Sequence, residues 1–319
     1  MLSILTADSA LRAPLGQVHA LAETSATRRQ GLLAAGLTVL IWSIYFLSLQ
    51  LGMRSALTLF DLALLRYAVP GVLLLPWLIR RWPTISQVPI LYRLGMIGGA
   101  GLPFFLLSGE GMALSQVAVA STLIPGMAPI FISTLAVLFF RQGVTRTRRI
   151  GLAIIATGVL LLLGQAWLGP ASLGVRGPLL LIGASFCWAL FTVSVRQSGL
   201  TALEAAAVVV VPNGALALAL AWTAEVPFAF GGLPGWALAS QLVVQGLVVG
   251  LGSSLAYGYA ITRLGAELTS TIGALTPVVA GSLALLLLRE TATGVMLMGM
   301  TLVVIGVIGA SGWLTRPHR

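Results

Sequence analysis

Two charged residues stand inside otherwise apolar stretches of the sequence, and they are the first candidates for chemistry. Arg66 lies within LFDLALLRYAVPGVLLLP (59–76), and Glu110 lies between two glycines close to the end of another apolar run. At 1.5 Å per helical residue, Arg66 is about 10 Å from the start of its run and Glu110 about 6 Å from the end of its own. A charge in a membrane span costs about 2.5 to 3.5 kcal/mol on insertion scales, so functional residues are expected at such positions.

Three interpretations of Arg66 and Glu110 are open. They face a cavity near its outer mouth, where they pair with each other or hold opposite ends of a zwitterionic cargo. Alternatively, they form a structural ion pair that locks two helices together. In the third interpretation, Arg66 extends its head group to the membrane surface.

Aromatic residues provide a second set of candidates. Trp42 with Tyr45, and Trp188 with Phe191, are spaced i to i+3, which places each pair on one helix face. If both faces point to a shared axis, they form an aromatic wall for an amphipathic or cationic cargo. The alternative is ordinary packing between helices.

Prolines and hydroxyl side chains occur together in two later runs. A proline leaves the carbonyl four residues earlier without its helical donor, and such carbonyls are tolerated at membrane depth only against protein or a watery cavity. Kinked helices that carry hydroxyls are therefore candidate cavity walls, unless neighbouring Ser or Thr side chains satisfy the freed carbonyls. The candidates are Ser121, Thr122, Pro125 and Pro129 in one run, Thr269, Ser270, Thr271 and Pro277 in the other, and Asn213 beside Pro212.

The sequence offers little for enzymatic or metal chemistry. Cys187 is the lone cysteine, and His19 and His318 both lie in the tails, so neither a metal site nor a disulfide is expected. A chain without lysine has no Walker A motif. An intramembrane hydrolase would need a membrane histidine or a pair of midplane acids. We therefore expect no enzyme, no metal and no cofactor.

Composition indicates the elements that position these residues. With 58% hydrophobic residues, 8% charged residues and a mean hydropathy of +1.02, the chain belongs in a bilayer. A crossing helix needs about 20 apolar residues, and continuous apolar runs exclude an alternating barrel pattern. Ten helical spans are predicted, at 31–50, 59–79, 94–114, 117–140, 149–167, 178–195, 203–224, 237–259, 267–288 and 294–314.

Charge predicts how these spans are oriented. All 18 basic residues are arginines, and 14 of them fall in the tails and the even-numbered turns. The positive-inside rule then places both termini in the cytoplasm. The chain is expected in the cytoplasmic (inner) membrane of a bacterium. The expected partners are a small-molecule substrate and the lipid bilayer, with no nucleic acid. Gly95 with Gly99 and Gly246 with Gly250 predict close packing inside the monomer, with a homodimer as the alternative.

The second half of the chain repeats the first. Residues 118–160 laid over 266–308 give 11 identities in 43 positions, which include the four pairs Pro129 and Pro277, Arg141 and Arg289, Gly151 and Gly299, and Gly158 and Gly306. Two similar capping boxes, Thr58 to Asp61 and Thr201 to Glu204, begin the second helix of each copy. Because each copy has five spans, the second copy enters the membrane in the opposite direction. An all-α membrane protein of two inverted five-helix repeats is predicted, with a site near the midplane.

At these residues the chain resembles the EamA family of the drug/metabolite transporter superfamily, which has two EamA repeats of five helices. The Trp42 and Trp188 stretches, ALLRYAVPGVLLLP (63–76) and the proline-bearing run 121–163 resemble its pattern. The family's Leu-Gly-Glu-like exit is kept as Glu290 in the second copy, whereas the first copy has Gln142.

The resemblance implies a tail at 1–30, repeats at 31–167 and 178–314, and a tail at 315–319. It also implies a secondary transporter that moves a small organic metabolite, such as an amino acid or a drug-like compound, outward by alternating access. A channel-like facilitator and a non-transporting sensor are the alternatives.

Overall fold

The computed structural model describes residues 25–55, 57–168, 174–223, 230 and 234–311, without the side chains of Ser25, Ala26, Ala266, Glu267 and Ser270. The predicted C-terminal tail, most of the N-terminal tail and the side chain of Ser270 lie outside this part of the chain.

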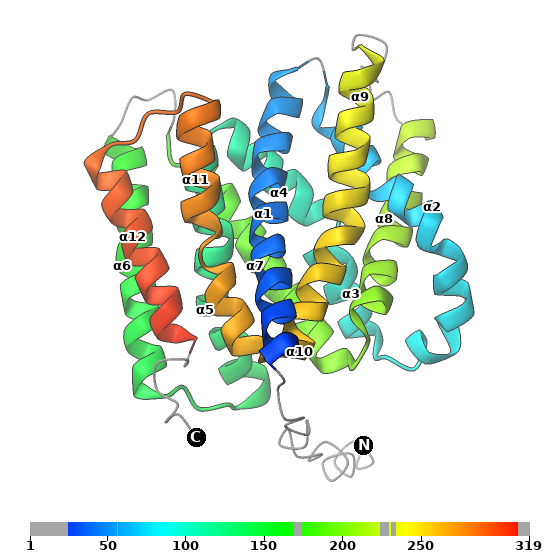
Figure 1. The fold of residues 1–319 in the computed structure, drawn as a ribbon, viewed down its shortest axis with the longest axis horizontal. Coiled ribbons are helices and arrows are strands. Elements are labelled where there is room, and N and C mark those ends of the chain that lie inside the picture. Colours follow the sequence, from blue (N-terminus) through cyan, green and yellow to red (C-terminus); the bar gives the residue numbers. More distant parts are fainter. Residues whose placement is uncertain (1–24, 56, 169–173, 224–229, 231–233, 312–319) are drawn as a thin grey trace.

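All secondary structure in the described residues is helical. The helices are α1 (Ser25–Arg54), α2 (Leu59–Ile85), α3 (Ile90–Gly99), α4 (Leu102–Ala113), α5 (Val117–Phe140), α6 (Arg146–Leu168), α7 (Arg176–Ser198), α8 (Ala202–Thr223), α9 (Gly235–Gln241), the π-helical segment η3 (Leu242–Gly252), α10 (Ser253–Gly273), α11 (Thr276–Leu287) and α12 (Gly294–Ala310). Helix α1 runs the height of the molecule, and its limits name the two ends used below, the Ser25 end and the Arg54 end (Figure 1).

Eight helical stretches of the described chain are long and apolar enough to cross a membrane. Two shorter apolar helices, Thr271–Leu287 and Gly294–Ala310, follow them. The chain is therefore a multi-pass, all-helical membrane protein. The predicted run at 117–140 coincides with α5, whereas the predicted eighth and ninth spans are divided by a break in α10 at Gly265, where φ is +79°.

The third predicted span is not one helix, because it breaks between Gly99 and Leu102. Several glycines and Pro103 make this stretch a poor helix interior. Asn213 of α8 spans the break: its Oδ1 accepts from the Leu102 amide (2.8 Å), and its Nδ2 donates to the carbonyls of Ile97 (3.0 Å) and Val209 (2.7 Å). Asn213 is thus fully engaged with the backbone, and the hypothesis that it contacts cargo is replaced by this structural role.

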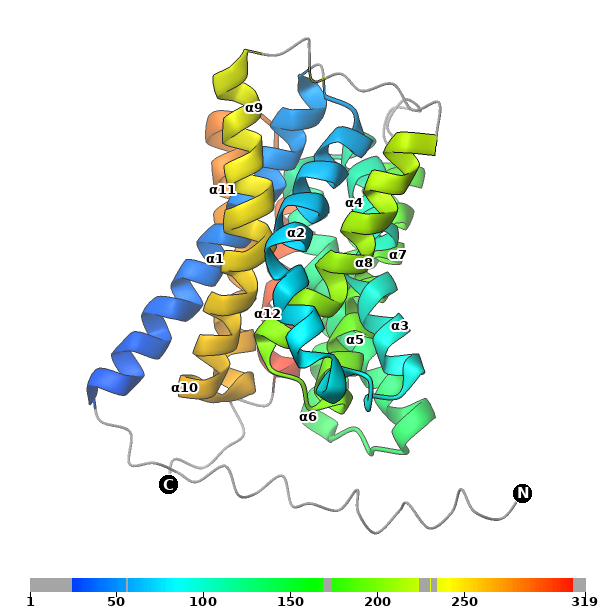
Figure 2. The same cartoon turned by 90° about the vertical axis from the view of Figure 1, so that its right-hand side faces the viewer.

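Helices of the two repeats pack against each other reciprocally. Helix α2 packs on α8 and α6 packs on α12, so helices in the same position of each repeat meet (Figures 1 and 2). Helix α7 packs on α3, α4 and α5, and α1 packs on the corresponding η3, α10 and α11. Reciprocal contacts of this kind are what a two-fold relationship requires.

Backbone geometry repeats as well. Arg141 (φ 50°) and Arg289 (φ 54°) are the non-glycine residues with positive φ in the described chain; Arg141 is the C-cap of α5, and Arg289 follows Leu288, the C-cap of α11. After them, the amide of Gln142 donates to Ala136 O (3.1 Å) and that of Glu290 to Ala284 O (3.3 Å). These residues correspond in the alignment of 118–160 with 266–308, so both helices end with the same cap.

Aligned glycines allow α6 and α12 to approach closely. A β-carbon on Gly158 would lie 2.7 Å from the carbonyl oxygen of Gly299, and one on Gly151 would lie 2.8 Å from that of Gly306. Gly95 and Gly99 pack in the same way on α7, and Gly246 and Gly250 pack on α2. These four glycines therefore serve packing within the monomer.

The two predicted capping boxes are present. Thr58 and Asp61 exchange both capping hydrogen bonds at the start of α2, and Thr201 and Glu204 do so at the start of α8. Glu204, 3% exposed, also accepts from Arg81 Nε at 2.7 Å, which joins α2 of the first repeat to α8 of the second.

Candidate functional site

Two tryptophans from different repeats meet near the middle of the molecule. The rings of Trp42 (α1) and Trp188 (α7) lie edge to face with their centroids 6.1 Å apart. Tyr257 of α10 lies 5.2 Å from Trp42, and Phe104 of α4 lies 5.4 Å from Trp188. Edge-to-face and tilted contacts at these separations are favourable aromatic geometries. Both repeats therefore contribute to one aromatic cluster.

A cavity of about 130 Å³ adjoins this cluster. Its lining residues are Trp42, Pro125, Gly126, Ala128, Pro129, Ile132, Trp188, Thr192, Tyr257, Gly273, Ala274, Pro277, Val303, Val304 and Val307. This wall is apolar and aromatic, with hydroxyls only at Thr192 and Tyr257 and no charged side chain. The three prolines predicted to kink helices, Pro125, Pro129 and Pro277, all line this cavity, together with Gly126 and Gly273.

The cavity continues toward the Ser25 end. A smaller cavity of about 60 Å³ shares Ile132 and Thr192 with it and extends between α5 and α7. Its further lining includes Phe140, Gln142 and Arg196, which lie where α5 and α7 end. The aromatic cavity therefore has a second, smaller cavity beside it on the side of the Ser25 end.

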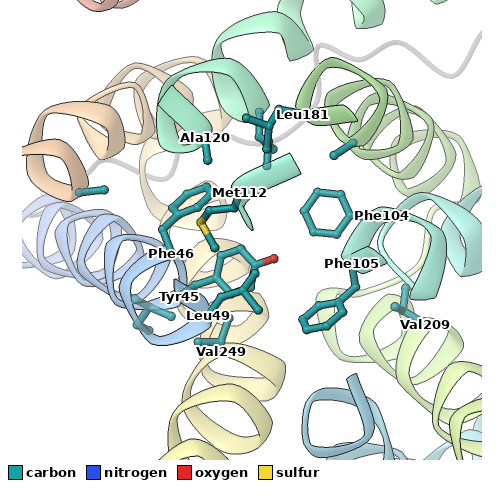
Figure 3. Packing of buried hydrophobic residues seen from close by; sticks show 14 of the residues in the cluster. Tyr45, Phe46, Leu49, Phe104, Phe105, Met112, Ala120, Leu181, Val209 and Val249 are labelled. Carbon is teal, nitrogen blue, oxygen red and sulfur yellow. The ribbon is translucent and has the colours of Figure 1, made fainter. Parts of the chain in front are cut away.

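Toward the Arg54 end, packed side chains close off the cavity. Tyr45, Phe46 and Leu49 of α1 converge on Met112 of α4 and Ala120 of α5 (Figure 3), and none of the five is more than 5% exposed. The Tyr45 hydroxyl is also hydrogen-bonded to Ser108 Oγ at 3.0 Å. Tyr45 thus belongs to the closing layer, one helical turn beyond Trp42, and does not line the cavity.

Arg66 lies beside this closing layer. Its Cζ is 5.2 Å from the centre of the Tyr45 ring, and its Nη1 is buried with no hydrogen-bond acceptor among the described residues. Glu110 is exposed, and the ion pair found within the described ranges is Arg81 with Glu204. The interpretation of Arg66 and Glu110 as an ion pair is therefore wrong, because α4 turns Glu110 outward while Arg66 packs on α1.

Most of the predicted hydroxyl groups bond their own helices. Ser121 and Thr122 both donate to the Ala118 carbonyl, and Thr269 donates to the Gly265 carbonyl. All three are at most 1% exposed and are absent from the cavity wall. Such local bonds compete with solvent or ligand contacts.

The hydroxyls of Thr271 and Thr276 form structural hydrogen bonds within the second repeat. Thr271 donates to Ser311 Oγ at 3.0 Å, which links α10 to α12. The Gly273 carbonyl, which Pro277 leaves without a helical donor, accepts from the Thr276 hydroxyl at 2.8 Å. A neighbouring threonine thus satisfies this kink.

Phe191 is close to the site without lining it. Its ring lies 5.1 Å from that of Trp188, while its backbone faces α3, where a β-carbon on Gly99 would come within 2.5 Å of its amide nitrogen. It therefore supports the Trp188 ring from behind.

Thr192 and Tyr257 line the cavity, although neither was among the sequence candidates. Thr192 follows Trp188 by four residues and so occupies the same helix face, a signal that the sequence contained. Tyr257 lies in a glycine-rich stretch with no spacing that distinguishes it. Only the packing of α10 on α1 brings it to Trp42.

The site is suited to enclosing a small molecule. An aromatic wall binds apolar bodies and attracts cations through the ring faces. Within the described ranges, no group of three His, Cys, Asp or Glu residues is placed to hold a metal ion.

Known proteins extend this description. The EamA-like transporter family model matches the chain twice, at residues 29–164 and 175–312. An uncharacterized transporter of Archaeoglobus fulgidus is 28% identical over 130 residues, which are 40% of this chain and 45% of that protein, so the match spans less than half of the relative's length. A solved crystal structure shares the fold with a TM-score of 0.60 at 17% identity, over 89% of this chain and 97% of its own. Since the two family matches together cover most of the sequence, the chain belongs to the EamA-like transporter family.

Proposed function

We propose that this membrane transporter is a secondary carrier that moves a small organic molecule by alternating access between two inverted repeats. The observation that carries the proposal is the contact between Trp42 and Trp188, one from each repeat, at a cavity that has a second cavity beside it toward the Ser25 end. Inverted repeats in transporters enclose such midplane sites and expose them to each side in turn.

Ten crossings fit the helices better than eight. The two shorter apolar helices hold 17 residues each, about 25 Å at 1.5 Å per residue, and a hydrocarbon core of about 30 Å is bridged once their flanks or a thinner bilayer contribute. Ten crossings also give five to each repeat, which an inverted arrangement requires.

The Ser25 end is proposed to face the cytoplasm. By the bounds and order of the helices that carry them, this end holds Arg28, Arg29, Arg80, Arg81, Arg93, Arg141, Arg146, Arg148, Arg149, Arg196 and Arg263, whereas Arg54, Arg176 and Arg289 lie at the other end. By the positive-inside rule, both termini are proposed to lie in the cytoplasm. The membrane is proposed to be a bacterial cytoplasmic membrane. In this orientation the smaller cavity lies on the cytoplasmic side, and export remains the direction expected from the family resemblance.

The cavity indicates the size and character of the cargo. At about 130 Å³ it is smaller than the roughly 300–1,000 Å³ typical of sites for drug-sized ligands. A small metabolite with an apolar or aromatic body suits it better than a drug-sized compound. We propose that the Thr192 hydroxyl, which donates to the Trp188 carbonyl at 2.8 Å, accepts a hydrogen bond from such a molecule.

Arg66 is proposed to meet an anionic group of the cargo when the closing layer opens. Its buried Nη1 has no acceptor among the described residues, and Tyr45 under its guanidinium is only one turn from Trp42. An Arg66→Gln variant should lose preference for a carboxylate-bearing ligand over its amide, and Arg66→Lys should keep part of it. Equal preference in all three proteins would remove Arg66 from the cargo path.

Counterflow in liposomes tests the proposed mechanism. A thermal-shift screen of the purified protein against metabolites identifies a ligand, because a ligand that binds only the folded state raises its apparent stability. Liposomes preloaded with that ligand should then accumulate labelled ligand transiently. A channel gives no such trans-stimulation, and its absence would contradict a carrier.

A further inference from the structure

Glu290 joins the second repeat to the first at the Arg54 end. Its Oε1 accepts from the Val117 amide at 2.8 Å, and its Oε2 accepts from the Ala118 amide at 3.2 Å. These are the first two amides of α5, where the helix dipole favours a negative charge. Hydrogen bonds to a carboxylate are stronger than those between neutral groups. The connection between α11 and α12 is therefore held on α5 by a charged cap.

The repeat-related position at the Ser25 end has a different residue. Gln142 follows Arg141 as Glu290 follows Arg289, with the same positive φ and the same backbone cap. The counterpart of Val117 is Gly265, where α10 breaks and restarts as a helix. The side chain of Gln142 is exposed and forms no hydrogen bond with the residues that the structure describes.

The state of each end follows the state of its cap. The Arg54 end, where Glu290 is engaged, is the end closed by the layer around Tyr45 and Met112. The Ser25 end, where Gln142 is disengaged, is the end that holds the smaller cavity, and Gln142 itself lines it.

We infer that Glu290 and Gln142 are alternating latches of unequal strength, and that the carboxylate of Glu290 biases the carrier toward the state closed at the Arg54 end. The inference rests on the proposed alternating access. When the Arg54 end opens, Glu290 must leave α5, and Gln142 would engage the helix that restarts after Gly265. An amide brings no charge to that helix terminus, so the second latch is the weaker of the two.

Exchanging single atoms at the two latches tests the inference without a cargo. In a Cys187→Ser background, spin labels on Ala113→Cys and Gly294→Cys measure a distance across the Arg54 end. A second pair, on Gly143→Cys and Thr262→Cys, measures a distance across the Ser25 end. All four positions are exposed. Glu290→Gln should raise the population with long distances at the Arg54 end by about tenfold, the loss of one charged contact. Gln142→Glu should raise the population with short distances at the Ser25 end.

Matched controls separate a latch from a general charge effect. Gln197→Glu makes the same chemical change as Gln142→Glu within the same small cavity, and Glu110→Gln removes an exposed carboxylate near the Arg54 end. Both should leave the distances unchanged.

Unchanged distances in Glu290→Gln, or equal effects of Gln142→Glu and Gln197→Glu, would overturn the latch. If Glu290→Gln does not fold, the comparison of Gln142→Glu with Gln197→Glu decides. If the distances respond but counterflow is absent, the latch stands and the transport proposal fails. If counterflow occurs and the distances do not respond, only the latch fails.

Discussion

The indole rings of Trp42 and Trp188 lie edge to face, 6.1 Å apart, at corresponding places in two halves of the chain. Each belongs to the first helix of its repeat, and these two helices otherwise pack on reciprocal sets of partners. In the proposed inverted-repeat arrangement, this contact lies at the axis that relates the repeats. A rocking motion about that axis would uncover the same wall from either end.

Replacing these tryptophans should weaken cargo binding. For Trp42→Ala and Trp188→Ala, we expect affinity for the ligand found by thermal shift to fall about tenfold each, since a ring–ligand contact is worth about 1–2 kcal/mol. Phenylalanine at either position should restore part of it. Trp222→Ala is the control, because Trp222 is 91% exposed. Unchanged affinity in both tryptophan variants would place the cargo elsewhere.

Asn213→Ala should destabilise the protein rather than alter its cargo preference. The substitution leaves the Leu102 amide and the Ile97 carbonyl without their partner at a buried break, and each unsatisfied group costs about 1–3 kcal/mol. Thermal unfolding in detergent measures the loss. Thr223→Ala, which removes an exposed hydroxyl bonded to its own helix, should change little. An Asn213→Ala protein of normal stability with a changed ligand profile would restore Asn213 to the cargo site.

Gly158→Ala should lower stability, whereas Gly164→Ala on the same helix should not. The added methyl at 158 would lie 2.7 Å from a backbone oxygen of α12, while Gly164 has open space. Overpacking costs about 1–3 kcal/mol, and alanine in an open helical position gains about 0.5–1 kcal/mol. Opposite signs in thermal unfolding are expected. Equal effects would show that α6 and α12 are not held this closely.

Arg289→Gly should stabilise the fold. Arg289 has φ of 54°, and a non-glycine residue in this region costs about 1–2 kcal/mol, which glycine avoids. Arg54→Gly, at the end of α1, serves as the control because a helical glycine only adds entropy to the unfolded chain. If Arg289→Gly is less stable than the parent, the arginine side chain must contribute contacts that outweigh the strain.

The sequence predicted features that depend on local pattern. The apolar run at 117–140 coincides with α5 because its length and composition match one crossing, and both capping boxes formed because each needs only four consecutive residues. Thr192 was within reach of the same reasoning, since it lies one turn from Trp188.

Features that depend on distant partners were out of reach. The break at Gly101 is stabilised by Asn213, more than a hundred residues away, and Glu290 caps a helix that begins at Val117. Arg66 and Glu110 shared a predicted depth, but depth does not fix the direction in which a side chain points. Hydroxyls such as Ser121 looked available for cargo because spacing does not show that a residue bonds its own helix.

Accessibility of the cavity from each side of the membrane tests the central claim most directly. A Thr192→Cys variant in a Cys187→Ser background carries one cysteine, which lies in the cavity wall. In proteoliposomes, an impermeant maleimide labels this cysteine either from outside or, when trapped, from inside. Alternating access predicts reciprocal rates: Glu290→Gln should speed labelling through the Arg54 end and slow it through the Ser25 end. Rates that rise together, or labelling that never occurs through the Arg54 end, would contradict the account.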